Sequence, residues 1–444
     1  MDRQKRPLRQ CTRWFNILAT RFPNLSRTEV RTLALWSFAA TLTQHIGLTT
    51  CAGFLAPLFD QSFDSVRQRL RELYWGAAQK RGSSRRALNV ERCFAPLLRW
   101  VLHLWKRTTG GPGNADTLVL ALDATLIRDR LAILSISVLL RGSAVPVAWT
   151  ITRAGAEGSW VPLCRRLFER LAEAGVPTDC PVLVLTDRGL ESRRIFEAIT
   201  EHGWHPMMRL TRRGTWREKG QTHWHALSGL LSGPGRYYLG SGHLYKTNPF
   251  ACTLLAIWEE GYSEPWLLMT DLTPQQCRGN GTERGNGTEH SGVSAACYGL
   301  RAWIEQGFRC LKGGAYHYQR TRIVDPARAE RVWLVLAVSL LWTHALGGSL
   351  GGGETASGET ASGETASGET ASGDSAIGGG LLGPFRVGVR RVLGVHRSGW
   401  IQLLVAALRG EDLPMPKALV GAPLPELPAD LVILTNLSGP DPPS

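Results

Sequence analysis

The sequence contains nine cysteines but lacks any pair of them at the Cys-x-x-Cys spacing. That spacing is typical of zinc ribbons and of dithiol redox motifs, so neither kind of site is indicated. We interpret the cysteines as reduced thiols; they occupy positions 11, 51, 93, 164, 180, 252, 277, 297 and 310.

The sequence also lacks an apolar segment of bilayer length. The first residues, Met1 to Arg6, are highly charged and no apolar stretch follows them, so no signal peptide is predicted. The longest apolar run, Val332 to Trp342, is shorter than the roughly 20 residues that a transmembrane helix needs. We interpret this run as a core helix and expect no membrane partner and a cytoplasmic location.

Acidic residues are few relative to basic ones. The 444-residue chain has 37 Asp and Glu against 51 Lys and Arg, which gives a formal charge of +14 at pH 7. This excess suits a polyanion such as DNA or an anionic surface, although a generic basic protein stays an alternative on charge alone. With 43% hydrophobic residues, the chain is long enough for two or three domains with cores.

Two short apolar runs each stop at an aspartate. Residues 117–125 contain Asp123, and residues 181–189 contain Asp187. Nearly continuous apolar runs of this length are typical of buried central strands. The sequence therefore predicts two buried strands with an aspartate at the end of each.

A third carboxylate lies in a predicted amphipathic helix, residues 298–312. Glu305 sits beside its apolar side, with Arg301 four residues before it and Arg309 four residues after it. Taken alone, this pattern also fits a surface glutamate in two ordinary helical ion pairs. The apolar side chains recur at steps of three and four residues, at Leu300, Trp303, Ile304, Phe308 and Leu311.

The three carboxylates together predict a metal site. Carboxylates that converge repel one another and are costly to bury, so such a set persists mainly where divalent cations neutralise it. Oxygen ligands suit Mg²⁺ or Mn²⁺, and two such ions can hold the attacking and leaving oxygens of a phosphodiester. We therefore expect Asp123, Asp187 and Glu305 to bind two ions and to be catalytic.

The order of these residues resembles the DDE transposases of the insertion sequence 4 family. The family's Tyr, Arg, Glu and Lys signature is matched by Tyr298, Arg301, Glu305 and Lys312. The resemblance covers about residues 115–347, and it departs from the family in that Ala302 separates Arg301 from the tryptophan that usually follows.

The resemblance implies an α/β, ribonuclease H-like catalytic domain over residues 115–347. It implies that Tyr298, Arg301 and Lys312 contact phosphates of the transposon end, and Arg188 is a further candidate for a DNA contact. It also implies a prokaryotic, nucleoid-associated protein that acts on terminal inverted repeats and target DNA, which we expect to do so as a homodimer.

The N-terminal residues 1–110 are predicted to form an all-α, basic domain that binds the transposon end. Ser26 and Glu29 make a capping box for a helix that runs to about residue 45. A further helix, with Asp64 as its expected cap, carries arginines on a polar face that can reach phosphates or guanine edges. A solvated basic face gives the same pattern; the arginines are Arg67, Arg69 and Arg71.

The remaining segments are assigned by composition. Alternating aromatic strands predict a β subdomain inserted at about residues 211–274, in which Trp258 and Trp266 are either base-stacking or core residues. Residues 278–290 are expected to form a mobile loop. Residues 348–380 include four Gly-Glu-Thr-Ala-Ser repeats and are predicted to be a flexible linker, followed at 381–444 by a basic and then proline-rich tail.

We therefore predict a DNA transposase that cleaves the ends of an insertion sequence and transfers the strand into target DNA. Two alternatives stay open. A ribonuclease H-like nuclease would cut without joining, and a domesticated DNA-binding protein would use the N-terminal helices without catalysis.

Overall fold

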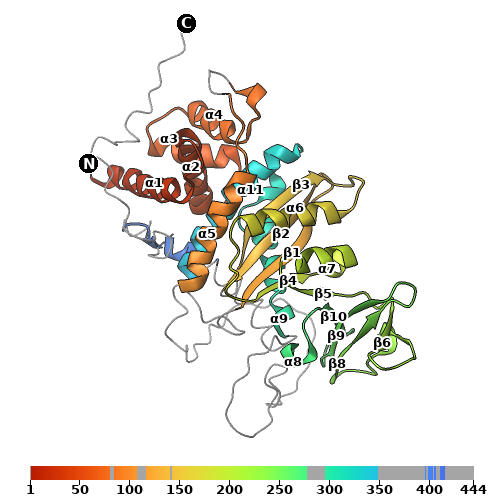
Figure 1. Cartoon of the computed structure of the whole chain (residues 1–444). Helices are drawn as coiled ribbons and strands as arrows, with labels where there is room; N and C mark the ends of the chain where they lie inside the picture. Colours follow the sequence, from red (N-terminus) through yellow and green to blue (C-terminus); the bar gives the residue numbers. More distant parts are fainter. Residues whose placement is uncertain are drawn as a thin grey trace, which may run out of the picture.

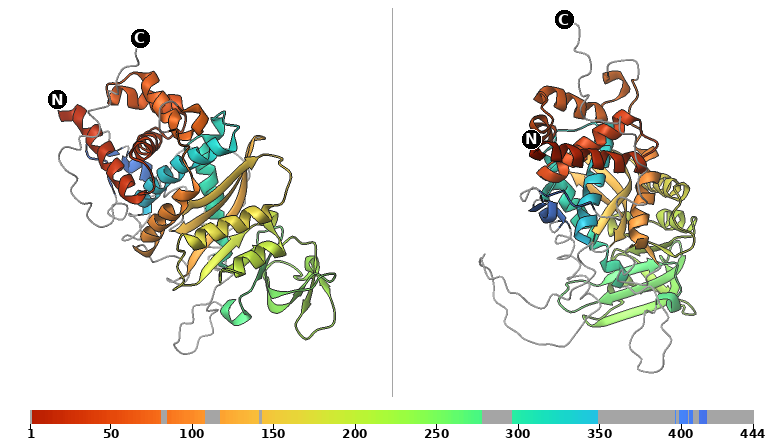
Figure 2. Two further views of the ribbon diagram at one scale, coloured as in Figure 1. Left: turned by 45° about the horizontal axis from the view of Figure 1, so that its top comes forward. Right: turned by 90° about the vertical axis from the view of Figure 1, so that its left-hand side faces the viewer.

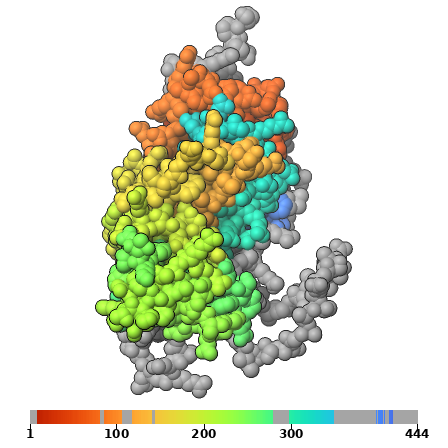
Figure 3. All heavy atoms as spheres, turned by 90° about the vertical axis from the view of Figure 1, so that its right-hand side faces the viewer, coloured from red at the N-terminus to blue at the C-terminus, as the bar shows by residue number. Residues whose placement is uncertain are grey.

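A computed structural model describes residues 2–80, 85–107, 117–140, 143–277 and 296–348, with short pieces between residues 396 and 415. The predicted loop at 278–290, the linker repeats and most of the tail lie outside the described residues. N-terminal helices lie at one end of the molecule, a sheet flanked by helices lies in the middle, and further strands lie at the other end (Figures 1 and 3).

The described N-terminal region is all-helical, as predicted. The capping box is present: the Ser26 hydroxyl accepts from the Glu29 amide, and the Glu29 carboxylate accepts from the Ser26 amide. The prediction of Asp64 as a cap is wrong, because the Ser62 hydroxyl accepts from the Ser65 amide and the helix begins before Asp64. The helices are α1 (Asp2–Arg21), α2 (Arg27–Thr43), α3 (Leu48–Leu58), α4 (Phe63–Tyr74) and α5 (Glu91–Arg107).

The middle of the molecule is a mixed α/β unit, which confirms the predicted class. Ten strands of the described residues form one sheet in the order β3-β2-β1-β4-β5-β10-β9-β8-β6-β7. The first five are β1 (Leu118–Ile127), β2 (Leu131–Leu140), β3 (Ser143–Arg153), β4 (Val182–Thr186) and β5 (His205–Arg209). Strands β1, β2 and β3 pair antiparallel, whereas β4 runs parallel to both β1 and β5.

Helices cover both faces of this part of the sheet (Figure 2). On one face lie α6 (Trp160–Glu173) and α7 (Arg193–Thr200), and on the other lie α10 (Ala302–Arg309) and α11 (Pro326–Gly348). Because helices cover both faces, β4 is buried along its whole length, as its apolar sequence predicts.

The strands of the 211–274 region extend the same sheet. Strand β10 pairs with β5, and β8 pairs with β9 in a long hairpin. The predicted β insertion is thus continuous with the central sheet through its last strand. Its strands are β6 (Thr215–Glu218), β7 (His225–Ala226), β8 (Arg236–Leu244), β9 (Phe250–Trp258) and β10 (Trp266–Thr270).

The predicted core helix around Val332 is longer than its apolar run. Asp325 caps it by accepting from the Arg328 amide at 2.8 Å, and α11 then extends over 23 residues. By length and composition it is the single candidate membrane span among the described residues, but 89% of its most apolar window is buried inside the protein.

Part of the C-terminal segment packs against the helical end. The ring of His396 is buried between Gln44 and Thr343, with Nε2 3.1 Å from Gln44 Oε1 and Nδ1 2.9 Å from Thr343 Oγ1. Burial lowers the pKa of His396 to about 4. His344 lies against the same ring, and burial lowers its pKa as well.

The burial of His396 predicts a loss of stability in mild acid. The pKa of His396 is 6.5 in the unfolded chain and about 4 in the folded protein. Between pH 6.5 and pH 4 the unfolded chain therefore binds a proton at His396 that the folded protein does not bind. The free energy of unfolding consequently falls as the pH drops below 6.5. In His396→Gln, the difference in unfolding free energy between pH 7.5 and pH 5.5 should shrink by about 1.4 kcal/mol. Urea titrations measure this, with exposed His223→Gln as the control; an unchanged difference would contradict the assignment.

Candidate active site

The register of two parallel strands brings Asp123 and Asp187 together. The pairing of β1 with β4 ends at Leu122 and Thr186, so the next residue on each strand is an aspartate at the same edge. One expectation is wrong in detail: β1 does not end at Asp123 but continues to Ile127, because β2 goes on pairing with it. Asp123 therefore lies within a strand and is buried, whereas the side chain of Asp187 is 34% exposed.

The helix predicted over residues 298–312 is observed in three pieces. A short helix, α9 (Ala296–Gly299), is followed by a turn, α10, and a π-helical turn at Cys310–Gly314. The apolar side packs on the sheet, and Gly307 permits close approach, since a Cβ there would lie 3.3 Å from the Ala144 carbonyl oxygen of β3. This packing fixes the position of Glu305 at the aspartate edge.

Arg301 joins the three carboxylates. Its Nη2 lies 3.1 Å from Asp123 Oδ2 and 3.0 Å from Asp187 Oδ2, and its Nη1 lies 2.5 Å from Glu305 Oε1. The predicted ion pair of Arg301 with Glu305 is thus present, but it belongs to a cluster that also includes both aspartates. The Arg301 side chain is only 9% exposed, and its Nε has no hydrogen-bond partner among the described residues.

The cluster perturbs the ionisation of its members. Burial raises the pKa of Asp123 to about 6, although Arg301 and the Ala124 amide pull it back down. Burial alone lowers the pKa of Arg301, but the nearby carboxylates outweigh it and leave that pKa raised. The arrangement is therefore a cation held among carboxylates at reduced solvent exposure, where ionic contacts are stronger than in water.

The other two residues of the predicted quartet, Tyr298 and Lys312, form hydrogen bonds with residues beside the carboxylate cluster. Tyr298 is buried and donates to the Thr186 carbonyl oxygen at 3.1 Å, at the end of β4. Lys312 Nζ lies 2.9 Å from Thr125 Oγ1, two residues beyond Asp123 in β1. Their contacts with DNA phosphates stay predictions.

The donor set fits magnesium or manganese. All three side chains offer carboxylate oxygens, and together they carry more negative charge than one guanidinium neutralises. Among the described residues, no three acidic, histidine or cysteine side chains are already arranged as metal ligands. The cation that contacts all three carboxylates in this structure is the guanidinium of Arg301.

The predicted DNA-contacting arginines of α4 are only partly exposed. Arg69 donates to Gln61 Oε1 at 3.0 Å, and the guanidinium of Arg71 lies over the Trp75 ring. The Nε of Arg67 is buried without a hydrogen-bond partner among the described residues. Because of these contacts, the arginine side chains of α4 are less exposed to solvent than the sequence pattern predicts.

Sequence reasoning missed two residues beside the cluster. Glu264 lies in the connection between β9 and β10 and forms an ion pair with Arg188, while Arg209, at the end of β5, reaches the same carboxylate at 3.1 Å. The signal that could have found Arg209 is its place at the end of a strand neighbouring the one that precedes Asp187.

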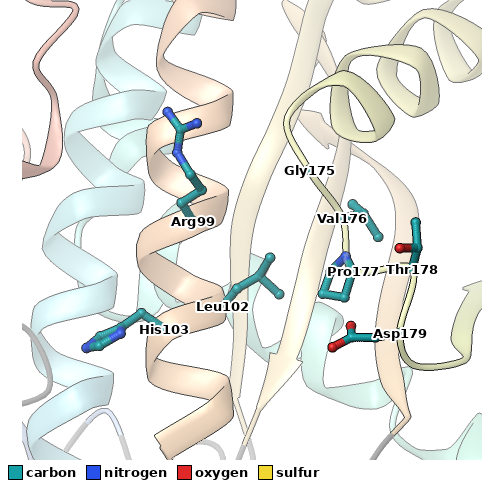
Figure 4. A pocket seen from close by; sticks show the side chains of 8 residues that line it. All are labelled: Arg99, Leu102, His103, Gly175, Val176, Pro177, Thr178 and Asp179. Atoms are coloured by element: carbon teal, nitrogen blue, oxygen red, sulfur yellow. The ribbon is translucent and has the colours of Figure 1, made fainter.

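A hollow of about 470 Å³ lies away from the carboxylate cluster. Helix α5 supplies Arg99, Leu102 and His103, and the loop after α6 supplies residues 175–179 (Figure 4). None of the sequence-predicted site residues lines it.

Comparisons with known proteins agree with the class of site. Residues 160–342 match the sequence model of a family described as the transposase DDE domain. This range includes Asp187 and Glu305, while Asp123 lies upstream and is connected to it through the pairing of β1 with β4. The match supports a transposase-type function acting on DNA.

The other comparisons add little. No curated protein matches the chain. Among solved structures, the chain is similar to the crystal structure of human ENDOV at 14% identity, over 54% of this chain and 92% of that one, with a TM-score of 0.21. At that TM-score the likeness supports no functional argument.

Proposed function

We propose that the chain is a DNA transposase of the insertion sequence 4 type with a ribonuclease H-like catalytic domain. The observation that carries the proposal is the meeting of Asp123, Asp187 and Glu305 around one guanidinium at an edge of the sheet. The sheet order β3-β2-β1-β4-β5, with β2 antiparallel to its neighbours, supports the fold assignment.

In this proposal Asp123, Asp187 and Glu305 hold two Mg²⁺ or Mn²⁺ ions. When bound, the ions supply charge neutralisation and Lewis-acid activation of a phosphodiester. The aspartates, fixed by paired strands, give the rigid half of the site, and Glu305 gives the more exposed half at 53% side-chain exposure.

In this proposal Arg301 binds the carboxylates when no metal is present and a DNA phosphate when metal is bound. Without bound metal it neutralises part of the carboxylate charge. Once other cations do so, its planar guanidinium is available to bind a phosphate of the transposon end, because carboxylate and phosphate offer the same paired acceptors. Tyr298 and Lys312 are proposed to act on the same DNA segment, with Arg188 as a further DNA-binding residue.

We propose that a homodimer of the protein binds the transposon ends and the target DNA. The +14 formal charge supports a polyanion as the partner. Light scattering of the protein with and without end-containing duplex tests the stoichiometry, and a monomer on each duplex under all conditions would count against the homodimer.

The central test is Glu305→Gln, which keeps the shape of the side chain and removes its charge. Cleavage of a supercoiled plasmid carrying the DNA that flanks the gene should fall at least about a hundredfold, because the carboxylate contributes several kcal/mol of charge stabilisation through the bound ions. Glu169→Gln, an exposed carboxylate on α6, changes the net charge equally and should cut normally.

Gel analysis with Mg²⁺ measures cleavage, and capture of a labelled end by a second plasmid measures strand transfer. Normal cleavage by the Glu305→Gln protein would contradict the proposed site. Cleavage by the wild-type protein without joined product would instead favour the nuclease that cuts without strand transfer.

The N-terminal helices are proposed to bind the transposon end through α4. Exchanging its three arginines for glutamine should weaken duplex binding and lower the slope of log K against log salt, by about 0.9 for each phosphate that the protein no longer binds. Anisotropy titrations at several salt concentrations measure the slope. A matched control removes three arginines from α6; an equal decrease in both would contradict a specific role for α4. The two sets are Arg67, Arg69 and Arg71 on α4, and Arg165, Arg166 and Arg170 on α6.

A further inference from the structure

A cavity of about 300 Å³ opens beside the carboxylate cluster. Its walls include Arg209 from β5, Trp266 from β10, and Tyr298 and Arg301 from the segment that carries Glu305. Glu305 and Glu264 also line it. The cavity therefore joins the catalytic edge of the sheet to the strands of the inserted region.

Two arginines converge on Glu264: Arg209 lines the cavity, and Arg188 contacts the Glu264 carboxylate from outside its lining. Arg188, the residue directly after Asp187, donates through both Nη atoms to the two oxygens of the Glu264 carboxylate, one of them at 3.3 Å. Arg209 donates to Oε1 at 3.1 Å from the end of the neighbouring strand. Two guanidinium groups from separate elements thus share one acidic partner, which leaves one positive charge uncompensated in the trio.

The ion pairs of Glu264 are poorly suited to a purely structural role. The Glu264 side chain is 32% exposed and lies in a connection between strands, and ion pairs that are this exposed to solvent contribute little to stability. By contrast, Arg209 is held at 17% exposure facing a cavity. Hydrogen bonds from Arg188 hold the pKa of Glu264 below its usual value, so the carboxylate is ionised at neutral pH.

We propose that Arg188 and Arg209 form a subsite for a backbone phosphate of DNA next to the catalytic carboxylates, and that Glu264 occupies this subsite in the DNA-free protein. The inference rests on the proposed function for its ligand class. Arginine binds carboxylate and phosphate through the same paired donors, so a phosphate can replace the Glu264 carboxylate without a change in the arginines.

In this proposal Glu264 competes with DNA phosphate for Arg188 and Arg209. When a phosphate enters, the carboxylate has to leave, and the connection between β9 and β10 moves with it. Removing the charge of Glu264 should release both arginines and increase DNA affinity. If the ion pair is only structural, removing its charge should change DNA affinity no more than the same charge change elsewhere on the surface.

The test compares Glu264→Gln with Glu197→Gln. Glu197 pairs with Arg193 at 2.8 Å on the surface of α7, so its substitution frees one arginine and changes the net charge by the same amount. The probe is a fluorescein-labelled duplex of about 30 base pairs, titrated by anisotropy in EDTA at several salt concentrations. Relative to the control, Glu264→Gln should bind at least about threefold more tightly with the same log–log salt slope, because both complexes bind the same number of phosphates and only the competing carboxylate is removed.

Two further variants keep the proposal testable if Glu264→Gln does not fold. Glu264→Asp keeps the charge on a shorter side chain and should show a smaller increase in affinity, while Arg209→Gln should weaken binding and flatten the slope by about 0.9. Equal behaviour of Glu264→Gln and Glu197→Gln, or an unchanged slope in Arg209→Gln, would overturn the subsite.

These readouts do not depend on catalysis. If the wild-type protein leaves plasmid DNA uncut, but Glu264→Gln binds more tightly than its control and Arg209→Gln flattens the slope, the subsite stands and the proposed transposase activity fails. If cleavage is normal but Glu264→Gln matches its control, only the subsite fails.

Discussion

One guanidinium among three carboxylates is the interaction on which the proposed active-site edge of the sheet depends. Asp123 is buried in a strand and Asp187 follows the strand beside it, so their charges meet at the same edge. Without a cation that meeting would be costly, because the buried Asp123 carboxylate loses water and the neighbouring carboxylates repel one another. Arg301 supplies the cation, and the packing of α10 against β3 at Gly307 brings it there.

The same interaction links folding to function. One protein cation neutralises the cluster only in part, and we propose that divalent ions neutralise the remaining negative charge. The Nε of Arg301 also stays without a partner in the described residues, so its hydrogen bonding with the protein is incomplete and exchange with another ligand costs less. A similar exchange, with Glu264 as the protein's own anion, is what we infer for Arg188 and Arg209.

Much of this site is predictable from the sequence because it depends on local patterns. Apolar runs that stop at aspartates predict buried strands, and parallel strands place such residues at one edge, which the register of β1 and β4 confirms. The place of Glu305 beside the apolar side of its helix follows from helical spacing. The partners of Arg301 could not be predicted beyond Glu305, since its ion pairs with Asp123 and Asp187 depend on how α10 crosses the sheet.

Other features escape prediction because they are tertiary. The continuation of β1 past Asp123 depends on pairing with β2, and the break between α9 and α10 lies within a regular apolar pattern. The arginines of α4 have the sequence pattern of a solvated face, but neighbours such as Gln61 and Trp75 partly cover them. The burial of His396 against α2 and α11 joins it to Gln44, 352 positions away, which composition cannot reveal.

The central claim is that Asp123, Asp187 and Glu305 are one divalent-cation site that Arg301 neutralises while no metal is bound. Anomalous X-ray diffraction from crystals grown with Mn²⁺ tests it most directly. The account predicts manganese peaks at coordination distance, about 2.0–2.2 Å, from oxygens of both aspartates, with the Arg301 guanidinium moved away from them. Diffraction that shows Arg301 still bridging Asp123 and Asp187, with no manganese between the carboxylates, would contradict it.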